Sequence, residues 1–133
     1  MPTQFLNPPE LTPTSGWTQV VTSTGGKTIY VSGQVGVDER GQVVGKGDLK
    51  AQTEQTYANL AVALKAAGAS FQDVVKMNLY VVGLKPELVP LVREVRARYV
   101  DRDNPPASTL VGVSALVGAD WLIEIEVVAV VTD

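Results

Sequence analysis

The length, composition and charge of the chain exclude several classes of protein. It has 133 residues, 45% hydrophobic and 19% charged, which fits a folded domain and neither a disordered nor a membrane-spanning chain. No break in composition divides residues 1–133, so we expect one domain. The net charge of -3, without a run of Lys or Arg, indicates no nucleic acid partner and no membrane partner. Cys and His are absent, so chemistry must use carboxylates, Lys, Arg, Tyr, hydroxyls or backbone N–H groups.

The opening segment has no secretory signal, because it lacks a basic n-region and an apolar h-region. We therefore expect a cytoplasmic protein. Pro8, Pro9 and Pro13 predict an irregular lead-in without an element of its own. The two β-rich runs that follow, WTQVVTS and KTIYVSG, are separated by Thr-Gly-Gly at 24–26, and this pattern predicts a β-hairpin.

The strongest helix signal lies between Asp48, which can accept a hydrogen bond as N-cap, and Gly68, which is placed to stop the helix. Steps of three and four residues define its core-facing stripe, which contains Leu49, Thr53, Tyr57, Leu60, Leu64 and Ala67. A second helix is predicted over 85–100, with both of its prolines in the first turn. Its apolar stripe contains Leu88, Leu91, Val92, Val95 and Tyr99. Its arginines, Arg93, Arg96 and Arg98, are interpreted as a mildly basic solvated surface.

Strand signals surround these helices. VGVDERGQVVG predicts a strand pair or arm that turns at 38–41. Val74–Val82 alternates Val75, Met77, Leu79 and Val81 with polar residues, which predicts a strand with one buried face. Two further strands, ASTLVGVSALV and WLIEIEVVAVV, follow the loop before residue 107. The order of elements predicts an α+β sandwich in which two helices cover one face of a sheet.

The final predicted strand carries two carboxylates. We assign its helix-facing side to Ile123, Ile125, Val127, Ala129 and Val131. Glu124 and Glu126 fall on the opposite side with Leu122, Val128 and Val130. A merely solvated face has no need of three aliphatic residues, so we infer that another copy of the protein covers it, with at least one carboxylate at the edge of the contact.

Several motifs together resemble a known family. They are SGQVG, the helix at 52–68 with AAGAS, DVVK, PPAST and EIE near the C-terminus. Over residues 15–131 the chain resembles the RidA/YjgF family of reactive-intermediate imine/enamine deaminases. The resemblance implies a chorismate-mutase-like α+β fold and a homotrimer with small-molecule clefts between subunits. Neither a metal nor an organic cofactor is implied.

The resemblance also implies site residues. Glu124 matches a glutamate that positions the hydrolytic water, and Trp17 matches a cleft aromatic residue. Ser32 and Gly33 match the SGQ segment that lines the cleft. Backbone N–H groups from Ser108 through Thr109 to Leu110 are expected to stabilise developing negative charge, with Ser108 and Thr109 lining the cleft.

The chain departs from the family at Ser108. In the deaminating branch this position, in a PARS motif, holds the Arg that binds the substrate carboxylate, and a hydroxyl supplies neither its charge nor its fork of donors. Arg102, in the preceding loop, is a candidate replacement. Two functions stay open: hydrolysis of imine or enamine metabolites with atypical specificity, or a non-catalytic trimer that binds a metabolite. From the residues alone, a solvated Glu124, a core Trp17 and ordinary strand-edge hydroxyls at Ser108 and Thr109 also stay open.

Overall fold

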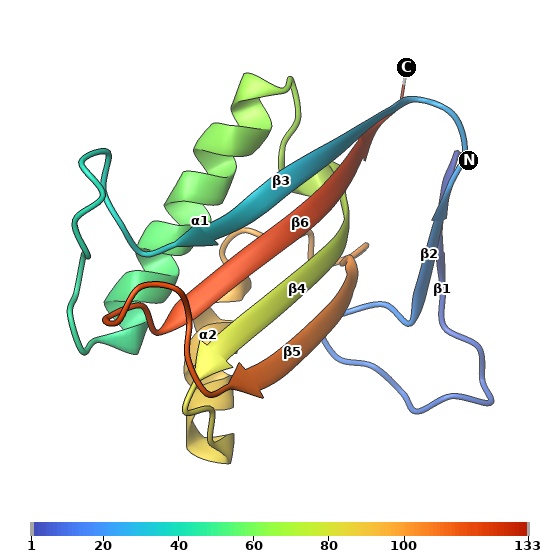
Figure 1. The fold of residues 1–133 in the computed structure, drawn as a ribbon. Coiled ribbons are helices and arrows are strands. Elements are labelled where there is room, and N and C mark those ends of the chain that lie inside the picture. The colour runs from blue at the N-terminus through green and yellow to red at the C-terminus, as the bar shows by residue number, and fades with distance from the viewer. Residues whose placement is uncertain (1, 133) are drawn as a thin grey trace.

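The computed structural model describes residues 2–132 and has two layers, a mixed sheet and a pair of helices. The elements in chain order are β1 (Thr3–Leu6), β2 (Val20–Ser23), β3 (Lys27–Val35), α1 (Leu49–Ala66), a 3₁₀ turn (Phe71–Asp73), β4 (Val74–Val82), a second 3₁₀ turn (Pro86–Leu88), α2 (Val89–Arg96), β5 (Ala107–Val113) and β6 (Ile123–Val131). The main sheet has the order β3-β6-β4-β5, with β4 and β5 parallel. Both helices cover the same face of this sheet (Figure 1), which confirms the predicted α+β fold.

Helix α1 begins and ends where the sequence predicts. The Asp48 side chain accepts a hydrogen bond from the Ala51 N–H at 3.0 Å, which satisfies one free donor of the first turn. Gly68, at φ +78°, provides the left-handed residue that ends the helix. Tyr57, Leu60 and Leu64 are fully buried in the core, as their spacing predicts.

The two central strands bury one face each. On β6 the buried residues are Ile123, Ile125, Val127 and Ala129, and the residues between them are half-buried, so the predicted division of faces is confirmed. On β4 the bounds are as predicted, but Val74 is buried and Val75 is not. A shift in the β4–β6 register between Val74 and Lys76 explains this error, because one extra residue moves the preceding side chains to the other face.

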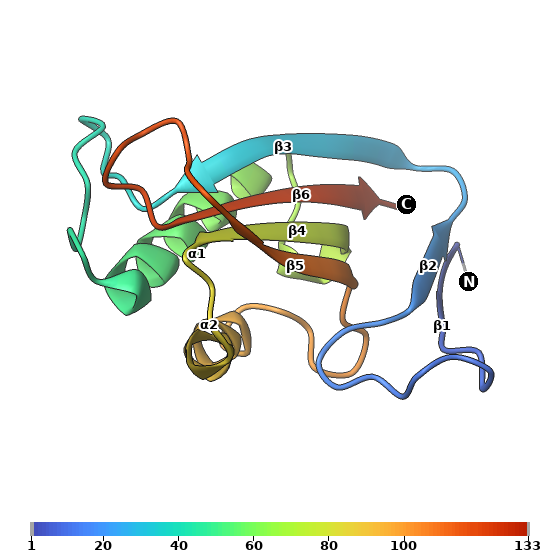
Figure 2. The same ribbon diagram turned by 60° about the horizontal axis from the view of Figure 1, so that its bottom comes forward.

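The predicted hairpin at the start of the chain is wrong. Strand β2 pairs with β1 in a separate two-stranded sheet, and β3 pairs with β6 instead. The expectation that the opening segment holds no element is also wrong, since β1 lies there. Gly25 and Gly26, both at positive φ, let the chain leave β2 in a new direction, and any Cβ on Gly26 would collide with the Val131 carbonyl. Figure 2 shows the small sheet standing apart from the helices.

The predicted arm turns at 38–41 as expected. The Asp38 carboxylate accepts hydrogen bonds from the N–H groups of Arg40 and Gln42, and a single bridge joins Val37 to Val43. The arm is therefore a tight turn rather than a full strand pair. Within residues 2–132, none of the helices has the length and apolar character needed to cross a membrane.

Candidate functional site

Strand β5 presents its side chains to both faces of the sheet. In the parallel β4–β5 register, Ser108 is opposite Met77 and Leu110 is opposite Leu79. Since Met77 and Leu79 lie in the core beneath the helices, Ser108 and Leu110 point to that same side. Thr109 points to the other side. The three residues predicted to act together on β5 are thus divided between the two faces.

The segment that carries Trp17 is fastened to the start of β5. The Thr18 N–H donates to the Pro106 carbonyl at 3.1 Å, and the Thr18 hydroxyl donates to the Pro105 carbonyl at 2.6 Å. Thr18 is itself buried and forms a parallel bridge with Ala107. These bonds hold the half-buried Trp17 beside the first residues of β5, although ninety residues of chain separate them in the sequence.

Trp17, Ser108 and Leu110 line one hollow of about 200 Å³, together with Arg93 and Arg96 of α2. The interpretation of Arg96 as part of a solvated surface is wrong, because this residue is only 8% exposed. Arg102 is exposed and lines a second hollow, of about 310 Å³, which also includes Arg93 and Arg96. Arg102 does not line the hollow that holds Ser108. The cations that line the hollow with Trp17, Ser108 and Leu110 therefore come from α2.

The burial of Arg96 has a signal in the sequence. Val92, Val95 and Tyr99 form a helical stripe, and Arg96 lies four residues after Val92 and three before Tyr99, on the same side of the helix. An Arg in the middle of an apolar stripe differs from its neighbour Arg98, which falls off that stripe. The side of the predicted helix on which each residue falls, rather than its charge, distinguishes Arg96 from Arg98.

The second group of predicted residues lies on the open face of the sheet. Glu124 of β6 is paired with Val35 of β3 and Tyr80 of β4. Its carboxylate lies directly over Gly33, where any Cβ would collide with it. Gly33 and Ser32 are both exposed. Within residues 2–132, the Glu124 carboxylate accepts no hydrogen bond.

Glu126, two residues along the same face, has a structural partner. The Tyr80 hydroxyl donates to the Glu126 carboxylate at 2.7 Å, which confirms the expectation that Glu126 pairs across the sheet. This hydrogen bond is the main reason that the pKa of Tyr80 is raised. On the same face the Lys76 ammonium donates to the Thr109 hydroxyl at 3.0 Å. Of the two carboxylates, Glu124 is the one left available to a ligand or a water molecule.

The predicted site residues therefore form two groups that a single chain does not bring together. Trp17, Ser108 and Leu110 lie on the helix side of the sheet, near its β5 edge. Ser32, Gly33 and Glu124 lie on the open side, with Thr109 on that side at the edge strand. Between residues 2 and 132, no group of three or more Asp or Glu side chains is placed to hold a metal ion.

A four-stranded mixed sheet with two helices on one face and a free carboxylate on the other defines the class of α+β protein to which this chain is assigned. Residues 8–131 match the family described as endoribonuclease L-PSP, and the chain belongs to this family, also called RidA/YjgF.

Known relatives agree with this assignment. The chain is 40% identical over 103 residues to a RutC family protein of Sulfurisphaera tokodaii, covering 77% of this chain and 79% of that one. It is 36% identical over 105 residues to the human 2-iminobutanoate/2-iminopropanoate deaminase, covering 78% and 73% of the two chains. The crystal structure of YyfB, a Rid family protein of unknown function from Yersinia pestis, covers 98% of this chain and all of its own at 36% identity, with a TM-score of 0.89.

Proposed function

We propose that the protein is a homotrimer in which neighbouring chains join the two groups of site residues into a cleft. In this cleft water hydrolyses the C=N bond of a small imine, which is present as such or forms when an enamine moves a proton from its nitrogen to its carbon. The observation that carries the proposal is the placement of Glu124, whose carboxylate lies without a partner over Gly33 on the face that no helix covers. The groups on the other side of the sheet can complement it only if a second chain supplies them.

The open face has the composition of a contact surface. Val128 and Val130 lie on it half-buried, Val130 in a hollow that Thr3 and Phe5 of β1 also line, and Tyr30 is 80% exposed on the neighbouring strand β3. Apolar side chains gathered on one sheet face are typical of surfaces that another protein covers. Strand β5 is at the edge of the sheet, and beyond its bridge to Thr18 it has no neighbouring strand on its outer side among the described residues.

The proposed chemistry uses few groups. Glu124 accepts a proton from water as the water oxygen bonds to the imine carbon, and the proton then passes to the nitrogen. The resulting aminoalcohol loses ammonia and leaves a carbonyl product. Backbone N–H groups at 108–110 stabilise negative charge on oxygen as the tetrahedral intermediate forms and collapses. The name of the human relative supports this class of reaction for the present chain.

The test is the release of pyruvate from 2-aminoacrylate generated in situ. We expect turnover by the wild type and a loss of at least about a hundredfold in Glu124→Ala, the usual contribution of a general base. Glu126→Gln is the matched control, since an amide oxygen still accepts from Tyr80, and its rate should stay near the wild-type value. Equal rates for wild type and Glu124→Ala would contradict the proposed role of Glu124.

The trimer has its own test, sedimentation of the wild type at micromolar concentration. We expect a mass three times the 14.1 kDa of one chain. A monomer would contradict the proposed cleft, because one chain does not bring its two groups of residues together.

A binding protein without catalysis is the second candidate, and the Ser at position 108 is the observation that favours it. Under this alternative the trimer binds a small metabolite and neither wild type nor variant releases pyruvate. Glu124→Ala would then change the affinity for the ligand, and no catalytic rate would be measured for either protein.

A further inference from the structure

Arg96 is a buried cation without a partner. The residue is 8% exposed, and within residues 2–132 its guanidinium makes no hydrogen bond and no ion pair. Among the described residues no side-chain nitrogen or oxygen is both enclosed and without a hydrogen-bond partner, so the guanidinium nitrogens of Arg96 are reached from the hollow that they line. A cation that is mostly withdrawn from water gains most from an acceptor that binds there. An unpaired guanidinium that borders a hollow is therefore placed to receive an acceptor from outside the chain.

The acidic side chains near α2 are directed elsewhere. Glu94 lies 3.6 Å from the Lys50 ammonium and 3.5 Å from the Arg98 guanidinium. Glu54 of α1 forms a further, shorter ion pair with Arg98 at 2.6 Å. Neither Glu54 nor Glu94 lines the hollow that holds Trp17. Asp101 lines the larger hollow with Arg93 and Arg96, but its carboxylate accepts from the N–H groups of Asp103 and Asn104. The smaller hollow, with Trp17 and Ser108, has no carboxylate among its lining residues.

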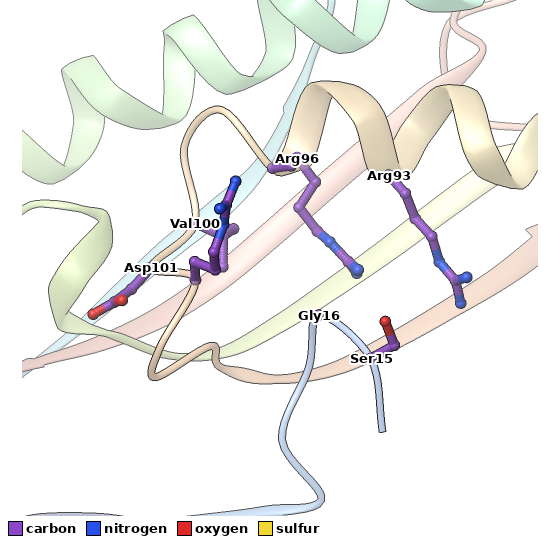
Figure 3. A pocket seen from close by; sticks show the side chains of 8 residues that line it. Ser15, Gly16, Arg93, Arg96, Val100 and Asp101 are labelled. Atoms are coloured by element: carbon purple, nitrogen blue, oxygen red, sulfur yellow. The ribbon is translucent and has the colours of Figure 1, made fainter. Parts of the chain in front are cut away.

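The loop before Trp17 is shaped around the Arg96 guanidinium. Figure 3 shows Arg96 directed toward Gly16, and Arg93 directed toward Ser15. A Cβ on Gly16 would lie 3.0 Å from the Arg96 Nη2 atom, and Gly16 has φ +78°, where only glycine fits without strain. The backbone therefore approaches one side of the guanidinium closely. The hollow with Trp17 and Ser108 is open to the same two arginines.

The electrostatics of the hollow favour an anion. Burial lowers the pKa of Arg96, Tyr57 opposes this effect, and the charge of Arg93 adds the smallest contribution, which is again a lowering. Guanidinium groups carry a positive charge at neutral pH in proteins, so the hollow is lined by two cations. Two neighbouring cations repel each other. An anion bound between them would offset this repulsion and would supply an acceptor for the guanidinium of Arg96.

We propose that Arg96, assisted by Arg93, binds the carboxylate of a small 2-imino or 2-oxo acid in the hollow lined by Trp17, Ser108 and Leu110. The substrate class rests on the proposed function. In the family resemblance the carboxylate-binding Arg stands on β5 at the position of Ser108. Here the cation comes from α2, and the short Ser108 side chain leaves room for the Arg96 guanidinium and the ligand. A hollow of about 200 Å³ suits an acid of a few carbon atoms.

The test is calorimetric titration with pyruvate, a stable acid that has a C=O bond in place of C=N. We expect the wild type to bind pyruvate and to bind the uncharged methyl pyruvate at least about tenfold more weakly. Arg96→Met should weaken pyruvate binding by about ten- to a hundredfold, the usual effect of losing a charge-assisted hydrogen bond. Arg98→Met, two residues after the end of α2 and outside the lining of the hollow, should bind as the wild type does.

A second variant places a carboxylate of the protein itself in the hollow. Ser108→Asp places an acceptor beside Arg96, so it should abolish pyruvate binding while both arginines remain. Unchanged pyruvate affinity in Arg96→Met, or a wild type that does not bind pyruvate at millimolar concentration, would overturn the proposal.

These outcomes are distinguishable from a failure of the proposed function. A monomeric or inactive wild type that binds pyruvate through Arg96 would refute the proposed function alone. Turnover that depends on Glu124, with pyruvate affinity that does not depend on Arg96, would refute this inference alone.

Discussion

The two helices differ in how their buried polar side chains are satisfied. On α1 the Gln52 amide donates to the carbonyls of Gly45 and Asp120 at 3.1 and 3.0 Å. Its oxygen accepts from the Leu122 N–H at 2.8 Å. Gln52 is fully buried, and it fastens the start of the helix to two loops. On α2 the buried polar residue is Arg96, and within residues 2–132 it has no such partner.

This difference separates two uses of buried polarity. The hydroxyls of Thr53 and Thr56 donate to the carbonyls four residues before them at 2.7 Å, so the other buried polar residues of α1 are satisfied as well. Buried polar groups in folded proteins are nearly always hydrogen-bonded, and among the described residues every enclosed side-chain nitrogen and oxygen has a partner. The polar groups of α1 contribute to the fold, whereas Arg96 borders a hollow and is directed at a ligand.

The largest expected effect comes from Gln52→Ala. Three backbone groups would lose their partner in a buried position, at a cost of about 1 to 3 kcal/mol each before relaxation. We expect the free energy of unfolding to fall by about 3 kcal/mol, measured by urea denaturation. Gln55→Ala is the control, since it has the same chemistry on the same helix and loses one hydrogen bond, to Asn59. Equal losses in the two variants would remove the proposed distinction.

The opposite sign is expected for Arg96→Met. Methionine keeps the aliphatic stem and removes a buried charge that has no partner, and such replacements are commonly neutral or stabilising. We expect the free energy of unfolding to stay level or to rise by about 1 kcal/mol, with the loss of pyruvate binding described above. A loss of stability comparable to that of Gln52→Ala would mean that Arg96 is structural.

The smallest expected effect comes from Arg98→Met. Arg98 pairs with two carboxylates, but its side chain is 45% exposed, and water and salt screen both pairs. We expect the free energy of unfolding to fall by less than about 0.5 kcal/mol in urea denaturation, and the difference from wild type to vanish at high salt. A loss above about 1 kcal/mol that persists in salt would contradict this ranking.

The elements with their own local signals could be predicted from the sequence. Asp48 and Gly68 define α1, and the alternation of β6 separates Ile123 and Ile125 from Glu124. Each of these features depends on neighbours within a few residues. The hairpin and the face of Val75 were wrong because each depends on a distant strand, since β2 pairs with β1 and a register shift against β6 moves the start of β4.

The candidate site could be predicted in part. Glu124 and Gly33 lie together, and so do Trp17 and Ser108, as the family resemblance implies. Their separation onto two faces depends on the register of β5, which the sequence does not reveal. The predicted solvent exposure of Arg96 was wrong because its charge alone makes it resemble Arg93 and Arg98. Its position on the apolar stripe predicts burial.

The position of β6 in the sheet has a consequence for how the protein is made. Strand β6 lies between β3 and β4, yet every other strand of the sheet precedes it in the sequence. Lys27 must find Val131 before β3 has any partner in this sheet. Pairings so distant in sequence form slowly, and until then both strand edges remain open. A ribosome must therefore release the chain through β6 before the sheet can close, and a nascent chain that stops before β6 is a substrate for chaperones and for aggregation rather than a folded intermediate.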